Sequence, residues 1–377
     1  MRACALVAPR RFELLTVPSP ALGPWDVRVR PAAVGVCGSD FHIASGEANF
    51  HCDERGAPIP FEVAPQILGH EITGTVVEVG KLVRDVAIGA RVVVDQGRSC
   101  KSERREPTCE YCASGNSHQC EFFAEHGITG LPGGFAEELV IPAVNVLPIA
   151  EGVPFEQAAM SEPLACVLHS TDFGERAAGR YRFGGGGSRV RTAVVLGAGP
   201  AGLLFVQVLR SVLAFDGAIV VCDPSSAKRA LAQSFGADVA TPAELREVVL
   251  QRSGGRLAEY VVEATGSGGV WAAIPHLIRK QATVLMYGIG HGDAAMSLLN
   301  QVQWREATLV TSVGASGGFD ADGRPSVYRR AQELVATGRV RVERLLTHRY
   351  PGLAAVPRAF GGDHARPDYV KGMVVLA

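Results

Sequence analysis

The chain has 377 residues, 47% of them hydrophobic and 20% charged, with a formal net charge of −1 at pH 7. This length favours two domains, because a domain usually takes about 150 residues. The balanced charge gives no electrostatic reason to expect nucleic acid or an anionic membrane as a partner, and the N-terminus lacks the apolar stretch of a signal peptide, so we expect a cytoplasmic protein.

Short strand-like runs fill residues 1–167. Examples are Asp26–Arg30 and Thr75–Val79, in which polar and apolar residues alternate between Gly and Pro boundaries. This pattern predicts half-buried antiparallel strands. A segment of mixed character begins near Gly318, and a last strand-like run, Met373–Leu376, ends the chain.

Three types of metal-ligating residue occur within residues 1–167. Cys37 opens the run Cys-Gly-Ser-Asp-Phe-His, and Gly-His-Glu follows at residues 69–71. Cys37, His70 and Glu71 offer a thiolate, an imidazole and a carboxylate, which suit a zinc site that keeps one position open to substrate. On its own this trio could be chance.

A polar stretch, residues 46–56, lies between the two halves of this trio, within a longer segment that runs to about residue 66. Its side chains could hydrogen-bond a polyhydroxylated substrate, or they could form an ordinary solvated loop. The sequence leaves both interpretations open.

Four of the nine cysteines crowd into one loop-like stretch, as Cys100, Cys109, Cys112 and Cys120. An odd cysteine count without a signal peptide argues against a secreted, disulfide-bonded protein. The cluster therefore indicates metal ligands in a reducing compartment.

From about residue 191, apolar runs alternate with segments of helical spacing. The expected strands are Ala193–Leu196, Ile219–Cys222, Tyr260–Val262, Thr283–Met286 and Leu309–Ser312, and the expected helices are Leu203–Val212, Ala227–Phe235 and Val270–Ile278. Alternation of this kind predicts a doubly wound parallel sheet. We place this α/β domain at residues 168–320.

A glycine-rich turn joins the first of these strands to the first helix. It contains Gly197, Gly199 and Gly202, with Pro200 and Ala201 before the last glycine. Such a turn binds a dinucleotide pyrophosphate at the helix N-terminus. Asp223 ends the next strand, where a carboxylate binds the ribose diol of NAD and repels the 2′-phosphate of NADP. No arginine directly follows it, so we expect NAD rather than NADP.

Together these motifs resemble the zinc-dependent medium-chain dehydrogenase/reductase family, which includes alcohol, sorbitol and threonine dehydrogenases. The resemblance rests on residues 37–42, 68–80 and 161–165, the cysteine loop and the glycine-rich turn. It implies a GroES-like, mostly-β catalytic domain made of residues 1–167 and 321–377, beside the α/β domain.

The resemblance also assigns roles to individual residues. Cys37, His70 and Glu71 match the family's catalytic zinc site, and Glu162 occupies the ligand position at which polyol and threonine dehydrogenases have a glutamate. Ser39 would accept the alcohol proton and His42 would pass it on, with Glu71 beside the metal. Asp40 would orient a ligand or a strand, whereas Cys166 is offset from the site and is expected to be a buried apolar residue.

The last three cysteines of the loop have the spacing of the family's second, structural zinc site. Cys100 departs from the pattern, because eight residues separate it from Cys109. Either this insertion loops out and Cys100 completes the four-thiolate site, or the lobe is degenerate with free thiols. The family commonly forms dimers or tetramers, so we expect a homodimer or homotetramer.

The preferred interpretation is an enzyme that transfers hydride from a secondary alcohol of a polyol, sugar or cyclitol to NAD. A simple alcohol or an amino alcohol such as threonine is the second choice of substrate. A non-catalytic nucleotide-binding relative would not need the full set of catalytic side chains. A zinc hydrolase, in which Glu71 activates water, would leave the glycine-rich turn and Asp223 unexplained.

Overall fold

The structure is a computed structural model that describes residues 1–184, 188–292 and 294–376. The chain forms two compact units. Unit 1 comprises Met1–Ala165, Ser316–Gly338 and Val342–Ala377, and unit 2 comprises Cys166–Ala315 with Arg339–Arg341. The chain passes from unit 1 to unit 2 inside helix α4 (Ser161–Arg176). Among the described residues, no helix is both long and apolar enough to cross a membrane.

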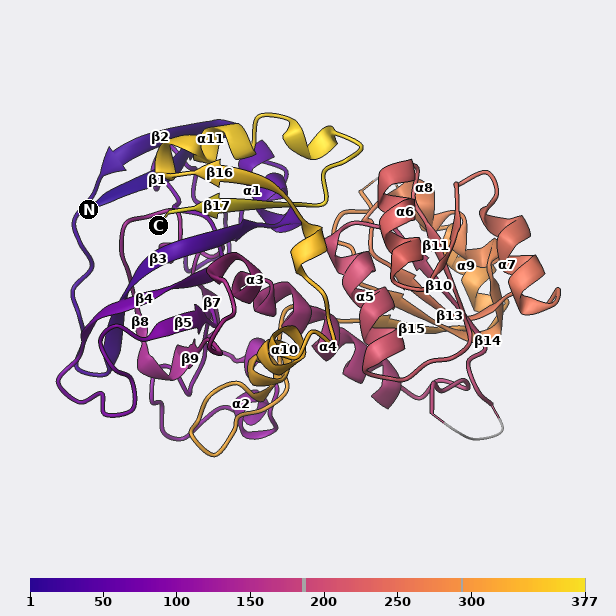
Figure 1. Ribbon diagram of the computed structural model, residues 1–377, viewed down its shortest axis with the longest axis horizontal. Coiled ribbons are helices and arrows are strands. Elements are labelled where there is room, and N and C mark those ends of the chain that lie inside the picture. The colour runs from indigo at the N-terminus through magenta and orange to yellow at the C-terminus, as the bar shows by residue number, and fades with distance from the viewer. Residues whose placement is uncertain (185–187, 293, 377) are drawn as a thin grey trace. The chain divides into compact units, whose positions relative to one another are not determined.

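Unit 1 is built on a seven-stranded sheet in which strands far apart in sequence are neighbours (Figure 1). The order is β16-β17-β3-β4-β5-β9, with β8 also paired to β3. These strands are β3 (Asp26–Val36), β4 (Glu71–Val79), β5 (Arg91–Val94), β8 (Leu139–Pro142), β9 (Val146–Pro148), β16 (Leu346–Pro351) and β17 (Lys371–Val375). Two further pairs are β1 (Arg2–Ala8) with β2 (Arg11–Thr16), and β6 (Gly97–Arg98) with β7 (Ala124–Glu125).

The helices of unit 1 are short. They are α1 (Gly38–Ser45), α2 (Glu110–Ala113), α3 (Phe155–Ala159), α10 (Ser326–Ala336), α11 (Val356–Ala359) and the start of α4. The buried core consists of the inward faces of the strands, where Val27, Val29 and Ile72 have no exposed surface. Buried residues alternate with more exposed ones over Asp26–Arg30 of β3, as the sequence predicted for a half-buried strand.

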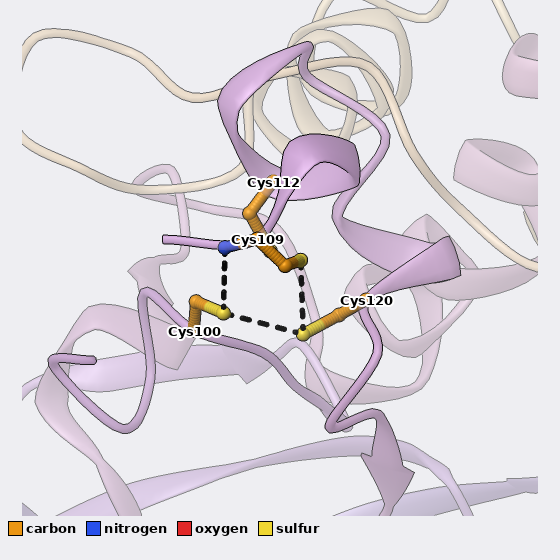
Figure 2. Close-up of side chains that lie close together, drawn as sticks. All are labelled: Cys100, Cys109, Cys112 and Cys120. Atoms are coloured by element: carbon orange, nitrogen blue, oxygen red, sulfur yellow. Dashed lines mark hydrogen bonds between the residues drawn. The ribbon is translucent and has the colours of Figure 1, made fainter. Parts of the chain in front are cut away.

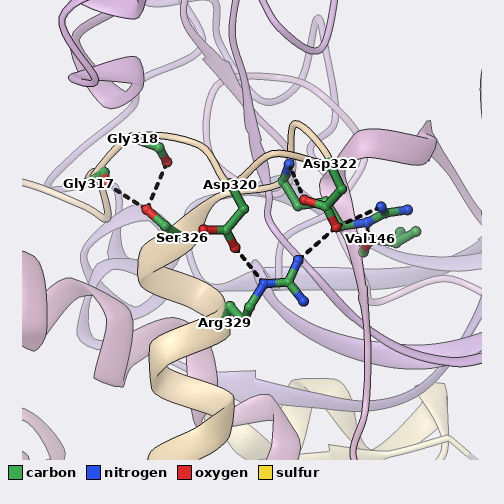
Figure 3. A network of polar contacts seen from close by, with 8 residues as sticks. Val146, Gly317, Gly318, Asp320, Asp322, Ser326 and Arg329 are labelled. Carbon is green, nitrogen blue, oxygen red and sulfur yellow. Dashed lines mark hydrogen bonds and ion pairs between the residues drawn. The ribbon is translucent and has the colours of Figure 1, made fainter.

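Helix α10 is fixed to unit 1 by a network of charged side chains (Figure 3). Arg324 has 5% of its surface exposed, donates to the Val146 carbonyl at 2.8 Å and pairs with Asp85 at 2.7 Å. Arg329 on the helix pairs with Asp320 at 2.5 Å and Asp322 at 2.7 Å. The segment that returns from unit 2 is thereby anchored next to β9.

Unit 2 contains a six-stranded, fully parallel sheet in the order β12-β11-β10-β13-β14-β15. The strands are β10 (Thr192–Leu196), β11 (Ala218–Cys222), β12 (Asp238–Ala240), β13 (Ala258–Glu263), β14 (Ile278–Met286) and β15 (Thr308–Thr311). The helices are α5 (Pro200–Ser211), α6 (Ser226–Ser234), α7 (Leu245–Ser253), α8 (Gly268–Trp271), α9 (Leu298–Gln303) and the rest of α4.

Helices lie on both sides of this sheet, with α5 and α6 on one side and α7 and α9 on the other (Figure 1). Residues from α7, α8 and α9 share one core with the strands, as Val249, Trp271 and Val302 show. The predicted doubly wound fold is confirmed. The order of the strands reverses between β10 and β13, which in such sheets marks the ligand-binding crevice.

One predicted element of unit 2 is wrong. The helix expected over Val270–Ile278 is replaced by the single turn α8, a 3₁₀ turn at Ile274–His276 and the start of β14 at Ile278. Pro275 has no N–H to continue a helical ladder, which explains why the helix ends. The sequence also missed β12, which has only three residues.

Candidate functional site

Three segments distant in sequence meet at one end of the sheet in unit 1. Cys37 directly follows β3, Glu71 begins β4, and Lys371 begins β17. The strand register sets Gly35 opposite Glu71, and Gly372 opposite Val36. Pairing in this register brings the ends of β3, β4 and β17 together, although about 300 residues separate Glu71 from Lys371.

Cys37, His70 and Glu71 form one group of candidate metal ligands. One ligand atom from each lies within 4.8 Å of those of the other two. His70 has 3% of its surface exposed and Glu71 has none. A soft thiolate, an imidazole and a carboxylate, all held at the same point, match the donor set of a zinc site. The predicted trio is thus brought together.

Asp40 orients both ends of this trio. Its Oδ2 accepts a hydrogen bond from the Cys37 N–H at 2.9 Å, and its Oδ1 lies 3.3 Å from Nδ1 of His70. Burial disfavours a protonated His70, but the charges of Asp40 and Cys37 outweigh it and raise the ring's pKa well above its usual value. Since Nδ1 faces Asp40, Nε2 is the nitrogen left for a metal, the usual carboxylate–histidine–metal arrangement.

Glu71 is paired with a buried lysine. Its Oε1 accepts a hydrogen bond from Nζ of Lys371, whose surface is 1% exposed, whereas its Oε2 has no hydrogen-bond partner among the described residues. Gly35 makes room for this side chain, because a Cβ at Gly35 would lie 1.8 Å from Glu71 Oε2. An orphaned, fully buried carboxylate oxygen beside a thiol and an imidazole fits a site built for a cation.

Glu162 lies outside the group whose ligand atoms fall within 4.8 Å of one another, so the structure brings together three of the four predicted ligands of the catalytic zinc. It is buried on the first turn of α4 and accepts a hydrogen bond from Gln96 at 3.0 Å. Burial disfavours the charged form of Lys371, yet the charges of Glu71, Cys37 and Glu162 raise the pKa of this lysine above its usual value. Glu162 therefore contributes to the same electrostatic environment.

Ser39 and His42 lie three residues apart on α1, so they share one face of this helix. The Ser39 Oγ is 4.0 Å from the Cys37 Sγ. His42 is exposed, and its Nδ1 bonds Glu47 Oε2 at 2.9 Å. The sequence did not predict Glu47 as the partner of His42, because Glu47 lies beyond the end of α1 and the turn at Gly46 brings it back.

The four cysteines of the loop converge, including Cys100 (Figure 2). The sulfur of Cys120 lies 3.6 Å from that of Cys100 and 3.8 Å from that of Cys109. In a tetrahedral site with Zn–S bonds of about 2.3 Å, ligand sulfurs are about 3.8 Å apart. All four side chains are buried, and none of the four forms a disulfide within the part of the chain that the structure describes, so their geometry fits a four-thiolate zinc site.

Backbone groups favour the thiolate form in this lobe. The N–H of Cys109 donates to the sulfur of Cys100, and the N–H of Phe122 donates to that of Cys120, each at 3.4 Å. Hydrogen bonds, of which the one from the Cys112 N–H is the strongest, lower the pKa of the Cys109 thiol to about 6, and the thiolate is the form that binds metals. Burial has the opposite effect on Cys112 and Cys120 and raises the pKa of both thiols.

The eight-residue insertion folds against the body of unit 1. Arg104 stacks over the ring of Trp25 and Arg105 over that of Phe122, with distances of 3.8 and 4.1 Å to the ring centroids. The insertion therefore loops out while Cys100 returns to the cluster, which is the first of the two arrangements considered from the sequence.

The glycine-rich turn of unit 2 has the geometry of a phosphate site. Gly197 has φ of +95°, and a Cβ on Gly202 would lie 1.9 Å from the Gly197 carbonyl oxygen. A Cβ on Gly199 would meet nothing within 4 Å, so the space in front of this residue is open. Gly199 caps α5, whose first turn contains Pro200 and Ala201 and leaves N–H groups for an anion.

Asp223 is fixed at the end of β11. Its Oδ2 accepts the Ala198 N–H and its Oδ1 the Ser225 N–H, each at 2.8 Å. Arg229 on α6 donates to the Asp223 carbonyl at 2.7 Å. This arginine was missed because it is six residues after Asp223 in sequence, although one helical turn returns it to the same place.

A second carboxylate occupies the same edge of the parallel sheet. Glu263 ends β13, has no exposed surface, and accepts bonds from the Thr265 N–H at 2.7 Å and His291 Nε2 at 2.9 Å. The sequence analysis overlooked it, although an acidic residue that ends an apolar strand is a recognisable signal for the carboxyl edge of a parallel sheet.

Comparison with known proteins yields matches over both units. A model described as the alcohol dehydrogenase GroES-like domain matches residues 23–151, and one described as zinc-binding dehydrogenase matches residues 200–336. L-galactonate-5-dehydrogenase of Escherichia coli is 31% identical over 88% of this chain and 86% of its own length. D-arabinitol dehydrogenase 1 of Uromyces fabae is 29% identical, with 93% and 90% covered.

Among solved structures, a protein of Sinorhizobium meliloti described as a zinc-binding dehydrogenase and bound to NADP is 28% identical. Its TM-score is 0.78, with 99% of this chain and 98% of that chain covered. The likeness thus extends over the whole chain, and all three similar proteins are described as dehydrogenases.

Proposed function

This chain belongs to the zinc-dependent medium-chain dehydrogenase/reductase family, and on that premise we propose that it oxidises a secondary alcohol of a polyol, sugar or cyclitol to the ketone, with NAD as the hydride acceptor. The names of the galactonate and arabinitol dehydrogenases support a polyhydroxylated substrate. The observation that carries the proposal is the buried convergence of Cys37, His70 and Glu71 in a chain that also has an open glycine-rich turn.

Cys37, His70 and Glu162 would hold the catalytic zinc, with Glu71 beside or on it. A bound zinc ion would supply a Lewis acid that favours loss of the alcohol proton. Asp40 keeps Cys37 and His70 in place through its two oxygens. Lys371 balances the carboxylate of Glu71, so that its charge is tolerated in a fully buried position.

The proton leaves through residues of α1. Ser39 is two positions from Cys37 and would accept the alcohol proton through its hydroxyl. His42, on the same helix face, would carry the proton to solvent, because its ring is exposed and bonded to Glu47. An imidazole has a pKa near neutrality and suits this transfer. Each turnover then yields the ketone, one proton and one reduced dinucleotide.

The dinucleotide would bind along the carboxyl edge of the sheet in unit 2. Its pyrophosphate would take the space in front of Gly199, and Asp223 would bind the adenosine ribose diol. A carboxylate in this position favours NAD. Arg229 beside Asp223 favours some use of NADP, which the Sinorhizobium meliloti protein binds. We propose NAD as the preferred cofactor and NADP as a weaker alternative.

A second zinc ion would occupy the four-thiolate lobe of Cys100, Cys109, Cys112 and Cys120. It would stabilise a segment that has no apolar core beyond the cysteines and Phe123. This ion would take no part in the reaction.

Substrate hydroxyl groups would be bound by the segment that follows α1. Asn49 is fixed there by its bonds to Ile59 and Gln66 at 2.7 and 2.9 Å. The loop is therefore ordered by its own hydrogen bonds, which is more typical of a binding surface than of a solvated linker.

We also propose a cytoplasmic homodimer or homotetramer, which light scattering on the purified protein would test.

The experiment is NADH formation by zinc-replete protein across polyols, aldoses, cyclitols, simple alcohols and threonine, each with NAD and with NADP. We expect turnover of one polyhydroxylated class, faster with NAD. Turnover of simple alcohols or threonine alone would contradict the substrate class. No turnover of any substrate, with zinc and NADH bound, would contradict the assignment as a catalytic dehydrogenase.

A further inference from the structure

A buried glutamine connects Glu162 to a helix from the C-terminal part of the chain. Gln96 lies two residues after the end of β5 at Val94, and 3% of its surface is exposed. Its Nε2 donates to Glu162 Oε1 at 3.0 Å, and its Oε1 accepts a hydrogen bond from the Tyr328 hydroxyl at 2.5 Å. Tyr328 lies on α10 and is 1% exposed. Neither residue belongs to a motif that the sequence analysis identified.

The surroundings of Gln96 determine which way its amide points. Glu162 and Glu125 lie on the side of Nε2, the latter at 3.4 Å. If the amide were turned over, its carbonyl oxygen would face two carboxylates and lose both hydrogen bonds. The observed orientation leaves the amide oxygen facing Tyr328, whose hydroxyl donates to it. The two carboxylates thus set the orientation in which Gln96 donates to Glu162, and Tyr328 holds the amide in place through a further hydrogen bond.

We propose that Gln96, secured by Tyr328, is a positioning residue that fixes the carboxylate of Glu162 for the catalytic metal. This inference rests on the proposed function, in which Glu162 is a zinc ligand. A carboxylate has two oxygens, so a hydrogen bond to one of them is compatible with metal binding through the other. Hydrogen bonds of this kind orient ligands, and their removal typically weakens metal binding by about 10–100-fold.

Helix α10 takes part in this positioning because Tyr328 lies on it. Arg329 joins this helix to Asp320 and Asp322 in the loop before it (Figure 3). Arg324 in that loop pairs with Asp85 and so attaches this segment to the rest of unit 1. The returning C-terminal segment therefore contributes to the metal site without supplying a ligand. If Gln96 only filled space, neither its hydrogen bond to Glu162 nor the hydroxyl group of Tyr328 would be required.

The test uses Gln96→Leu, Tyr328→Phe and the double variant. Two readouts that are independent of turnover are the affinity of the catalytic site for zinc, from competition with a chromogenic chelator, and the visible spectrum of the Co²⁺-substituted protein. We expect Gln96→Leu to weaken catalytic-site zinc by about 10-fold or more and to change the Co²⁺ bands. Tyr328→Phe should cause a smaller loss, and it should add nothing to Gln96→Leu because both act through one chain of bonds.

A matched control exists in unit 2. Gln207 is also a 3% exposed glutamine bonded at both ends of its amide, to the Arg341 carbonyl at 3.3 Å and the Arg341 N–H at 2.7 Å. Gln207→Leu makes the same chemical change away from Glu162 and should leave both readouts unchanged. If Gln96→Leu fails to fold, Tyr328→Phe keeps the ring and still tests the proposal alone.

Unchanged zinc affinity and Co²⁺ spectrum in Gln96→Leu, or in Tyr328→Phe where Gln96→Leu does not fold, would overturn the inference. The same loss in Gln207→Leu would overturn it as well, because the effect would then be general. Failure of the proposed function has a different signature. In that case Cys37→Ser would retain every zinc ion that the wild-type protein binds.

Discussion

A lysine with 1% of its surface exposed pairs with the fully buried Glu71, next to the predicted metal ligands. At the scale of single residues, this pair explains how a buried carboxylate is tolerated at the start of β4. A buried ion pair adds little net stability, but removing one partner leaves an uncompensated charge in the protein interior. Lys371 therefore matters more to the site than its distance in sequence suggests.

Lys371→Met should lower the free energy of unfolding by about 3–5 kcal/mol, because Glu71 loses its only buried cation partner among the described residues. Chemical denaturation of the metal-free protein measures this. The double variant Glu71→Gln with Lys371→Met should recover part of the loss. Arg366→Met, which breaks an exposed pair with Asp368, is the control and should change little. Equal stability of Lys371→Met and wild type would refute the argument.

Single residues should also determine the preference for NAD over NADP. Asp223→Ala should lower the ratio of kcat/KM with NAD to that with NADP by roughly tenfold or more, because a carboxylate facing the 2′-phosphate costs several kcal/mol. Arg229→Ala should raise the same ratio, since it removes the nearby cation. Steady-state kinetics with both dinucleotides measures this, and Asp216→Ala is the matched loss of charge. An unaltered ratio in Asp223→Ala would mean that the cofactor is selected elsewhere.

At the scale of elements, α10 depends on Arg324. The guanidinium group is buried, donates to the Val146 carbonyl and pairs with two aspartates. Arg324→Met would leave that carbonyl without this donor, so the free energy of unfolding should fall by about 1–3 kcal/mol.

Arg329→Met breaks only the more exposed pairs of the same network and should cost less than about 1 kcal/mol. Denaturant unfolding curves of the two variants provide the comparison. A larger loss in Arg329→Met than in Arg324→Met would show that the exposed pairs, and not the buried guanidinium, hold α10.

Element patterns were predictable where local chemistry determines them. The five expected strands of unit 2 lie within a residue or two of their expected ends, apart from β14, which begins five residues earlier at Ile278. The turn of Gly197, Gly199 and Gly202 has the strand before it and the helix after it that its spacing requires. The helix expected over Val270–Ile278 does not form as one element, because a proline within the segment interrupts the helical hydrogen bonds despite the helical periodicity.

At the scale of the whole molecule, the acid stability of unit 1 should depend on His126. Burial lowers the pKa of this ring to about 4, and the charge of Arg98 adds a smaller effect in the same direction. The hydrogen bond to the Pro132 carbonyl has the opposite effect and only partly offsets them. In the unfolded chain the pKa is about 6.5. Between these values the unfolded chain binds the extra proton, so the free energy of unfolding falls as the pH falls.

The titration of His126 should lower the free energy of unfolding by about 2 kcal/mol between pH 7 and pH 5. It should be absent from His126→Gln, which keeps a donor but does not titrate. Denaturation of both proteins across this range tests the claim. Parallel stability curves for wild type and variant would contradict it.

Long-range tertiary contacts account for what the sequence could not predict. Cys37, His70 and Glu71 were predictable because two short motifs contain them, and the structure brings them together. Lys371, Gln96 and Tyr328 were not, because only strand pairing and helix docking bring residues 96, 328 and 371 to the site. Whether Cys100 rejoins the cluster likewise depended on how the insertion folds against Trp25.

The central claim is that turnover requires a zinc ion held by Cys37 and His70, separate from the ion in the cysteine lobe. The most direct test adds zinc back to metal-free protein while bound zinc and NADH formation are both measured, in wild type, Cys37→Ser and Cys109→Ser. We predict two zinc ions in wild type and one in each variant, with activity abolished in Cys37→Ser and retained in Cys109→Ser. Full activity of Cys37→Ser, or activity that does not depend on added zinc, would contradict the account.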